Sequence, residues 1–369
     1  MIKNSILRFI LSEKIQVDQQ QKTKNRRKQQ EEIKKNKLKN KMQSNRVILA
    51  TASYDHTIRL WDQNQGCIET MSYSSNIPKR FDQINKQGFL VNKIEISQNK
   101  QYLGAATSFL AMIYDLGKAQ LSKIPVFAYD GYKNNVTSIG FNQDSKWIYT
   151  GSEDGSIQIH HLAMQGVPKI FSNKEPVSQV VLHPNEVDLI SVDQDGILKI
   201  WDLRNESQCR KEIVLAPKIG LRSVSIATNA QFFCAADSSG TLFIQNLGRN
   251  DEIISQQKIE NAHNDYILKC QISPFAKDIV TCSADRSIKI WSLNPQSQKF
   301  EHKNTLYHYR WVWDVSYGCD GQFLFSCSSD NTAKLWKLDK ESNQVEYQIF
   351  KGHTQTVNCV AINDIAINC

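Results

Sequence analysis

The sequence lacks the features that mark several common classes of protein. It contains no run of 18 apolar residues, so no helix is expected to cross a membrane. Its nine cysteines are scattered with no Cys-x-x-Cys pair, which predicts reduced thiols in a cytosolic protein and argues against a disulfide framework or a zinc site. A phosphate-binding glycine loop is also missing. We therefore expect no metal and no cofactor.

Positive charge is concentrated at one end of the chain. The 369 residues have a formal net charge of +8, yet residues 1–46 alone hold 14 Lys or Arg against 4 Asp or Glu, a net of +10. Residues 47–369 therefore carry a net charge of −2. Residues 19–41 are almost wholly Gln, Lys, Asn, Glu and Arg, a composition too polar to offset the entropy of ordering. We expect a basic, Gln/Lys-rich disordered tail over residues 1–46 and a folded domain over residues 47–369.

The tail has more than one interpretation. Apolar residues between Ile2 and Ile10 lie near helical spacing, as in a helix that binds a membrane surface or targets an organelle. The Lys/Gln tract that follows, however, does not have the composition of a transit peptide. Alternatively, translation starts at Met42 and residues 1–41 are an artefact of the gene model; a native peptide from this segment would exclude that.

The rest of the chain repeats with a period of 41–53 residues. In each repeat two short strands are joined by a tight turn, and the second ends in an aromatic residue or its replacement. These seven positions are Trp61, Tyr114, His160, Trp201, Gln245, Trp291 and Trp336. Such a period predicts an all-β, seven-bladed propeller.

Polar residues recur at fixed offsets within the repeats. Two sets stand at offsets 0, 18, 22 and 28: His263, Thr281, Asp285 and Trp291, and then His308, Ser326, Asp330 and Trp336. Because buried polar groups need partners, a hydrogen-bonded set must repeat with the fold. The sets resemble the His/Ser-Thr/Asp/Trp tetrad of WD repeats, which ties the strands of one blade together. A hydrolytic triad would also use His, Ser and Asp, but the constant Trp and the repetition argue against catalysis.

A third tetrad joins the two ends of the domain. Thr51, Asp55 and Trp61 keep the same spacing, but no His lies 18 residues before Thr51. The missing His is found as His353, followed by the strand-like residues 357–363. We predict that this C-terminal strand pairs with the N-terminal blade and closes the ring.

The other four repeats depart from the pattern. The third has Tyr132 in the His position and His160 in the Trp position, while the fourth keeps Asp195 at the turn and has Asn173 in the His position. The second and fifth have Ser at the turn position, so packing must hold them. The apolar residues expected to do so are Phe109, Ile113, Phe232, Phe233 and Phe243.

Four less generic segments point to one family. Residues 47–62, 129–155, 182–196 and 310–336 resemble the G-protein-β-subunit-like (lethal-with-sec-thirteen type) WD-repeat subunit of target of rapamycin (TOR) kinase complexes. The resemblance covers residues 47 to about 364; the tail, a long linker at 63–88 and His160 depart from it. It implies a non-catalytic scaffold in TOR complexes 1 and 2 that binds and stabilises the kinase domain in nutrient and growth signalling. It further implies a cytoplasmic protein, peripheral to endomembranes through its complex, without a small-molecule substrate.

Partner-binding residues are expected where loops lead into the innermost strands. Trp311 and Trp313 lie two residues apart outside the apolar columns of the repeats, and Trp is enriched at binding hot spots. Alternatively, both plug the central channel or pack on the next blade. Further candidates on this rim are Tyr54, Asn92, Asn135, Glu153, Gln194, Arg310, Ser329 and Gln355.

Three other functions compete with the kinase scaffold. A WD-repeat adaptor of another assembly, such as a ubiquitin-ligase substrate receptor, would have the same repeats. A nucleic-acid binder is suggested by the basic tail alone. An enzyme has the least support, because each His, Ser and Asp set is explained by the repeat.

Overall fold

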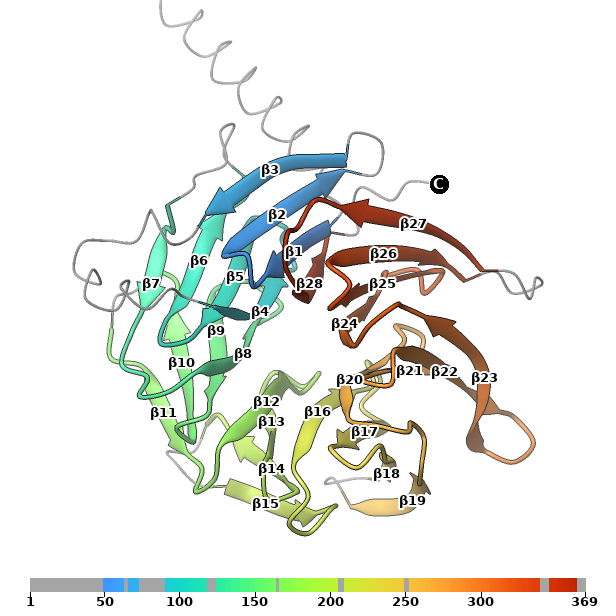
Figure 1. The fold of residues 1–369 in the computed structure, drawn as a ribbon. Helices are drawn as coiled ribbons and strands as arrows, with labels where there is room; N and C mark the ends of the chain where they lie inside the picture. The colour runs from blue at the N-terminus through green and yellow to red at the C-terminus, as the bar shows by residue number, and fades with distance from the viewer. Residues whose placement is uncertain are drawn as a thin grey trace, which may run out of the picture.

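The computed structural model describes residues 49–62, 66–72, 90–117, 124–163, 166–204, 209–248, 252–338 and 345–363. These residues form 28 strands in seven four-stranded antiparallel sheets, arranged as blades around a central axis (Figure 1). The predicted all-β, seven-bladed propeller is thus confirmed. The predicted tail at 1–46 lies outside the described residues.

Each blade is numbered by its order along the chain, with its strands given from the axis outward. Blade 1 contains β28 (Val357–Ile362), β1 (Leu49–Ser53), β2 (Thr57–Asp62) and β3 (Gly66–Ser72), and blade 2 contains β4 (Val91–Ile96), β5 (Tyr102–Thr107), β6 (Ala111–Asp115) and β7 (Phe127–Tyr129). Blade 3 contains β8 (Val136–Phe141), β9 (Trp147–Ser152), β10 (Ser156–His161) and β11 (Lys169–Ser172), and blade 4 contains β12 (Val177–Leu182), β13 (Asp188–Asp193), β14 (Ile197–Asp202) and β15 (Cys209–Val214). Blade 5 contains β16 (Leu221–Ile226), β17 (Phe232–Asp237), β18 (Leu242–Leu247) and β19 (Ile253–Ile259), and blade 6 contains β20 (Ile267–Ile272), β21 (Asp278–Ser283), β22 (Ser287–Asn294) and β23 (Lys299–Tyr307). Blade 7 contains β24 (Val312–Tyr317), β25 (Phe323–Ser328), β26 (Thr332–Lys337) and β27 (Glu346–Lys351).

Blade 1 closes the ring as predicted. Strand β1 pairs with β2 on one side and with β28, more than 300 residues later in the chain, on the other. In Figure 1 the red β28 accordingly lies beside the blue β1. The prediction of a linker over residues 63–88 is partly wrong, because residues 66–72 form β3, the outer strand of this blade. Residues 63–65 and 73–88 lie outside the described residues.

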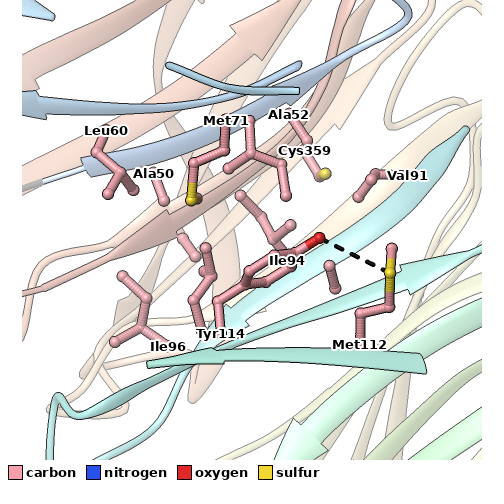
Figure 2. Packing of buried hydrophobic residues seen from close by; sticks show 14 of the residues in the cluster. Ala50, Ala52, Leu60, Met71, Val91, Ile94, Ile96, Met112, Tyr114 and Cys359 are labelled. Atoms are coloured by element: carbon pink, nitrogen blue, oxygen red, sulfur yellow. Dashed lines mark hydrogen bonds between the residues drawn. The ribbon is translucent and has the colours of Figure 1, made fainter. Parts of the chain in front are cut away.

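The core lies between neighbouring blades. Figure 2 shows the contact of blades 1 and 2, where Leu60 and Met71 pack against Ile94 and Tyr114. Second strands such as β13, β17 and β25 are buried along their whole length, whereas the outer strand β19 is mostly exposed. Side chains on both faces of a second strand are therefore buried between blades, whereas an outer strand presents most of its side chains to solvent.

Cysteine contributes to this core as a small apolar residue. Five of the described cysteines are buried and unpaired: Cys234, Cys270, Cys282, Cys327 and Cys359. Of the apolar residues predicted to hold the degraded repeats, Ile113, Phe232, Phe233 and Phe243 are buried. Phe109 is half-buried, and its neighbour Leu110 occupies the core position in blade 2.

The turn between the second and third strands of a blade needs one residue with positive φ. Gly196 supplies it in blade 4 with φ 82°, whereas Arg286 and Asn331 supply it in blades 6 and 7 with φ 73° and 67°. At Gly196 an added Cβ would overlap the carbonyl oxygen of Ala216. Glycine is therefore required there for both its backbone conformation and its size.

Candidate partner-binding face and the tetrads behind it

Blades 6 and 7 contain complete tetrads of nearly identical geometry. In blade 6 the indole Nε1–H of Trp291 donates to Oγ1 of Thr281 over 3.0 Å, and Thr281 lies 2.7 Å from Nε2 of His263. Nδ1 of His263 lies 2.9 Å from a carboxylate oxygen of Asp285. The corresponding three distances in blade 7 are 2.8, 2.8 and 2.9 Å. The predicted tetrads are therefore present as hydrogen-bonded chains.

The third tetrad spans the ends of the domain. Trp61 donates to Thr51 over 2.7 Å, and Thr51 lies 2.8 Å from Nε2 of His353. Nδ1 of His353 lies 2.8 Å from the carboxylate of Asp55. The prediction that His353 completes the first repeat agrees with this geometry, and the tetrad adds side-chain bonds to the β1–β28 pairing.

The charges within the tetrads follow from burial and hydrogen bonding. Burial raises the pKa of the Asp55, Asp285 and Asp330 carboxyl groups, but hydrogen bonds from the His and a nearby hydroxyl outweigh it and hold each pKa well below its usual range. Burial also lowers the pKa of His263 and His308, against the opposing effect of their Asp partners. A neutral ring that donates Nδ1–H to Asp and accepts at Nε2 from the hydroxyl fits this chain of donors.

These sets are placed to hold strands together. The hydroxyl-bearing residues Thr51, Thr281 and Ser326 are fully buried, so no substrate can reach them. Each hydroxyl oxygen also accepts a hydrogen bond from an indole N–H, which a catalytic nucleophile would not need. The geometry therefore assigns the tetrads to the stability of the blades.

Blade 3 builds a different network from the replaced residues. The Tyr132 hydroxyl lies 2.8 Å from Oγ1 of Thr150 and 3.0 Å from Nε2 of His160. The His160 ring also packs on Tyr129, with ring centroids 4.3 Å apart. Burial lowers the pKa of His160 to about 4, so this imidazole is neutral at pH 7.

Blade 4 corrects one sequence assignment. Asp195 was assigned to the turn position, but it is exposed, and the buried Asp193 takes over its role. The Asp193 carboxylate accepts the backbone N–H groups of Asp195 and Ile197, and accepts from Nδ2 of Asn173 over 3.1 Å. In blade 5 the buried Asp237 accepts N–H groups in the same way. The turn carboxylate has moved two residues toward the N-terminus in both blades.

Five of the predicted partner-binding residues gather at the junction of blades 7 and 1. Trp311, directly before β24, keeps 42% of its surface exposed. Its ring centroid lies 5.9 Å from that of Trp313, and Trp313 lies 6.2 Å from Tyr54. The half-buried Trp313 donates its indole N–H to Oγ of Ser329 over 2.6 Å. Arg310, beside them, is exposed.

Of the remaining candidates, Gln355 lies beside Tyr54, whose N–H donates to the carbonyl of the neighbouring Thr356 over 3.0 Å, and the other four lie on blades 2 to 4. Nδ2 of Asn92 donates to a backbone carbonyl over 3.0 Å, and Nδ2 of Asn135 donates to Glu153 over 2.9 Å. Gln194 and Gln355 are exposed on their own blades. The four residues on blades 2 to 4 are distributed around the rim, so the structure gathers one part of the predicted set.

A polar cavity of about 850 Å³ runs along the axis, lined by the innermost strands. Trp313 contributes to the lining of this cavity, in agreement with the alternative that the two Trp residues plug the central channel. It also packs against the core of blade 7. Inside the cavity Nζ of Lys93 lies 2.6 Å from Asp314, which also accepts the N–H of Val360 over 3.1 Å. This ion pair links blades 2, 7 and 1, and sequence reasoning missed it. Its signal was Asp314, a charged residue among the apolar residues Val312, Trp313 and Val315 of β24.

The described residues bring together no group of three His, Cys, Asp or Glu side chains that could hold a metal ion. Within the same residues no helix is long and apolar enough to cross a membrane.

Comparison with known proteins gives a consistent result. The model of the family described as "WD domain, G-beta repeat" matches residues 40–62, 123–161, 167–202, 255–292 and 300–337. The stretches between these matches contain blades 2 and 5, the two with Ser at the turn position.

Several proteins are similar over most of the chain. The target of rapamycin complex subunit LST8 of Bos taurus is 36% identical over 256 residues, covering 67% of this chain and 73% of the bovine protein. The target of rapamycin complex subunit wat1 of Schizosaccharomyces pombe is 32% identical over 260 residues, covering 70% and 78%. The protein LST8 homolog of Dictyostelium discoideum is 38% identical over 249 residues, covering 67% and 76%.

Proposed function

This chain belongs to the LST8 family of target of rapamycin (TOR) complex subunits, and from that membership we propose that it is a non-catalytic scaffold subunit of TOR complexes. Two of the similar proteins are named target of rapamycin complex subunits, and the WD repeats of this chain form a rigid ring suited to a scaffold. The fully buried tetrad hydroxyls support a subunit without chemistry of its own.

The finer proposal is that the face around Trp311 binds the TOR kinase domain. The observation that carries it is the cluster of Trp311, Trp313 and Tyr54, because an exposed Trp supported by a rigid aromatic neighbour is the arrangement of a binding hot spot. The hydrogen bond from Trp313 to Ser329 fixes this neighbour in place. A rigid anchor loses little conformational entropy when a partner binds.

The test replaces Trp311 by Ala and measures co-purification of the TOR kinase with the full chain from cells. We expect co-purification to fall at least tenfold while the melting temperature stays within about 1–2 °C, because Trp311 is largely outside the core. The double variant with Trp313→Ala should abolish binding but also lower stability, since Trp313 packs against the core.

Phe275→Ala is the matched control. Phe275 is 66% exposed in the turn after β20, at the opposite end of the innermost strands, and its loss should leave co-purification unchanged. Equal co-purification with Trp311→Ala and with the wild-type chain would refute kinase binding through this face. A wild-type chain that captured a different assembly and no TOR kinase would refute the scaffold itself.

A cytoplasmic location, peripheral to endomembranes through the TOR complex, is also proposed. Its support is the set of five buried, unpaired cysteines, which an oxidising compartment would not maintain reliably. Cell fractionation of the native protein is the direct measurement.

A further inference from the structure

One sector of the rim over blades 5 to 7 combines cationic and aromatic side chains. We call it the basic aromatic sector, and it consists of Lys218, Arg222, Tyr266, Arg286, Tyr309, Arg310 and Trp311. Tyr309 is 83% exposed, and Tyr266 at 43% is about as exposed as Trp311. The four cationic residues are exposed as well. Arg and aromatic residues are the types that dominate binding energy at interfaces.

The topology places these residues on one face. Tyr266 and Trp311 directly precede the innermost strands β20 and β24, and Arg222 is the second residue of β16. Arg286 lies in the adjoining turn of blade 6, where its carbonyl accepts the N–H of His308, one residue before Tyr309. All of them therefore lie at the end of the blades where Trp311 is found.

Two neighbouring blades already make one contact within the sector. The guanidinium carbon of Arg222 lies 5.6 Å from the centre of the Tyr266 ring, and its Nε donates to Oγ of Ser238 over 3.0 Å. Arg222 is thus held in position with much of its charge exposed.

Among the residues that the structure describes, no ion pair neutralises the cationic groups of the sector. Asp285 and Asp330 are committed to their tetrads, and Asp265 accepts the N–H of Tyr266. Among the described residues no carboxylate forms an ion pair with Arg286 or Arg310. The cationic groups are therefore available to a partner.

The same face over blades 3 and 4 has a different character. There Lys133 and Lys174 alternate with Asp130, Glu175 and Asp195. The two lysines and three carboxylates of this second region sum to −1, so it lacks the excess of positive charge found over blades 5 to 7.

We propose that the basic aromatic sector binds an acidic segment of a partner protein, one that carries several Asp or Glu carboxylates in an extended conformation. The inference rests on the proposed function and refines it, because it specifies the chemistry of the segment that docks beside Trp311. Arg side chains form paired, charge-assisted hydrogen bonds to carboxylates, and the exposed rings supply apolar contact between them. The attraction also accelerates association and weakens with added salt.

The test uses the full chain and a decamer of glutamate with benzoylphenylalanine at its centre. Photo-crosslinked sites are mapped by mass spectrometry at low and high salt, which distinguishes the sector from the basic residues 1–46. We expect crosslinks at Tyr266, Tyr309 or Trp311 that weaken at 0.3 M salt, because screening shortens the range of the attraction.

Charge reversal gives the decisive comparison. Arg286→Glu with Arg310→Glu should reduce these crosslinks and TOR kinase co-purification at least tenfold, whereas Lys133→Glu with Lys174→Glu on blades 3 and 4 should change neither. Crosslinks confined to residues 1–46, no crosslinks at all, or equal effects of the two reversals would overturn the proposal. If Trp311→Ala abolishes co-purification while the Arg reversal does not, the acidic partner is refuted and the kinase scaffold stands.

Discussion

The carboxylate of Asp55 offers the sharpest test of how the ring is fastened. It accepts four hydrogen bonds: from Nδ1 of His353 at 2.8 Å, from the N–H and the hydroxyl of Thr57 at 3.0 and 2.6 Å, and from the N–H of Thr354 at 3.1 Å. Two of these bonds connect residues from opposite ends of the domain. Asp55→Ala removes all four without adding bulk.

The expected cost follows from counting these bonds. Each contributes about 1 kcal/mol net, and the buried His353 loses its acceptor, so Asp55→Ala should lower the free energy of unfolding by about 3–4 kcal/mol. For a domain of this size that corresponds to a fall in melting temperature of roughly 6 °C. Asp330→Ala should cost the same, because Asp330 accepts the same four kinds of bond within blade 7.

The control is Asp195→Ala. Asp195 has the equivalent place in the sequence of blade 4, but its side chain is exposed and accepts no hydrogen bond from the described residues, so the expected change is below about 0.5 kcal/mol. Thermal and urea unfolding followed by Trp fluorescence measure all three variants. Equal stabilities of Asp55→Ala and Asp195→Ala would refute the view that the tetrads fasten the blades.

Three further predictions concern other parts of the ring. Burial lowers the pKa of His160 from 6.5 to about 4, so between these pH values the unfolded chain binds a proton that the folded chain does not. The free energy of unfolding should therefore fall as the pH drops from about 6.5 to 4. His160→Gln should weaken this pH dependence, as measured by urea unfolding at pH 7.5 and 5. Asp314→Ala deprives the buried Lys93 of its ion-pair partner and should cost about 3–5 kcal/mol, much of which Lys93→Met in the same chain should restore in a double-mutant cycle. Gly196→Ala, which meets a backbone carbonyl, should yield little folded protein, whereas Gly66→Ala, with a similar φ of 77° and open space around it, should cost only about 1 kcal/mol by chemical denaturation.

The sequence predicted those parts of the fold that depend on a repeated, buried polar network. The offsets of His263 and His308 were sufficient to locate the tetrads, and the absence of a His before Thr51 was sufficient to place His353 beside it. A polar residue in a core must have a partner, so its spacing carries structural information.

Other features depend on contacts that spacing does not encode. Blade 4 offers two Asp residues two positions apart, and only the structure shows that Asp193 points inward while Asp195 does not. The outer strand β3 has an exposed, irregular pattern and was predicted as part of a linker. The Lys93–Asp314 pair joins strands from different blades, which one sequence cannot align in space.

The pairing of β1 with β28 sets a minimum time for assembly of this molecule during translation. The two strands are separated by about 300 residues, which a ribosome adds in roughly 15–60 s at about 5–20 residues per second. Throughout that interval one edge of β1 has no strand to pair with, and unpaired edges attract other chains. Once the ring is complete, blade 1 has no open sheet edge. Until β28 emerges, however, the unpaired edge of β1 is exposed to misassembly, and chaperone access during synthesis is therefore a determinant of yield.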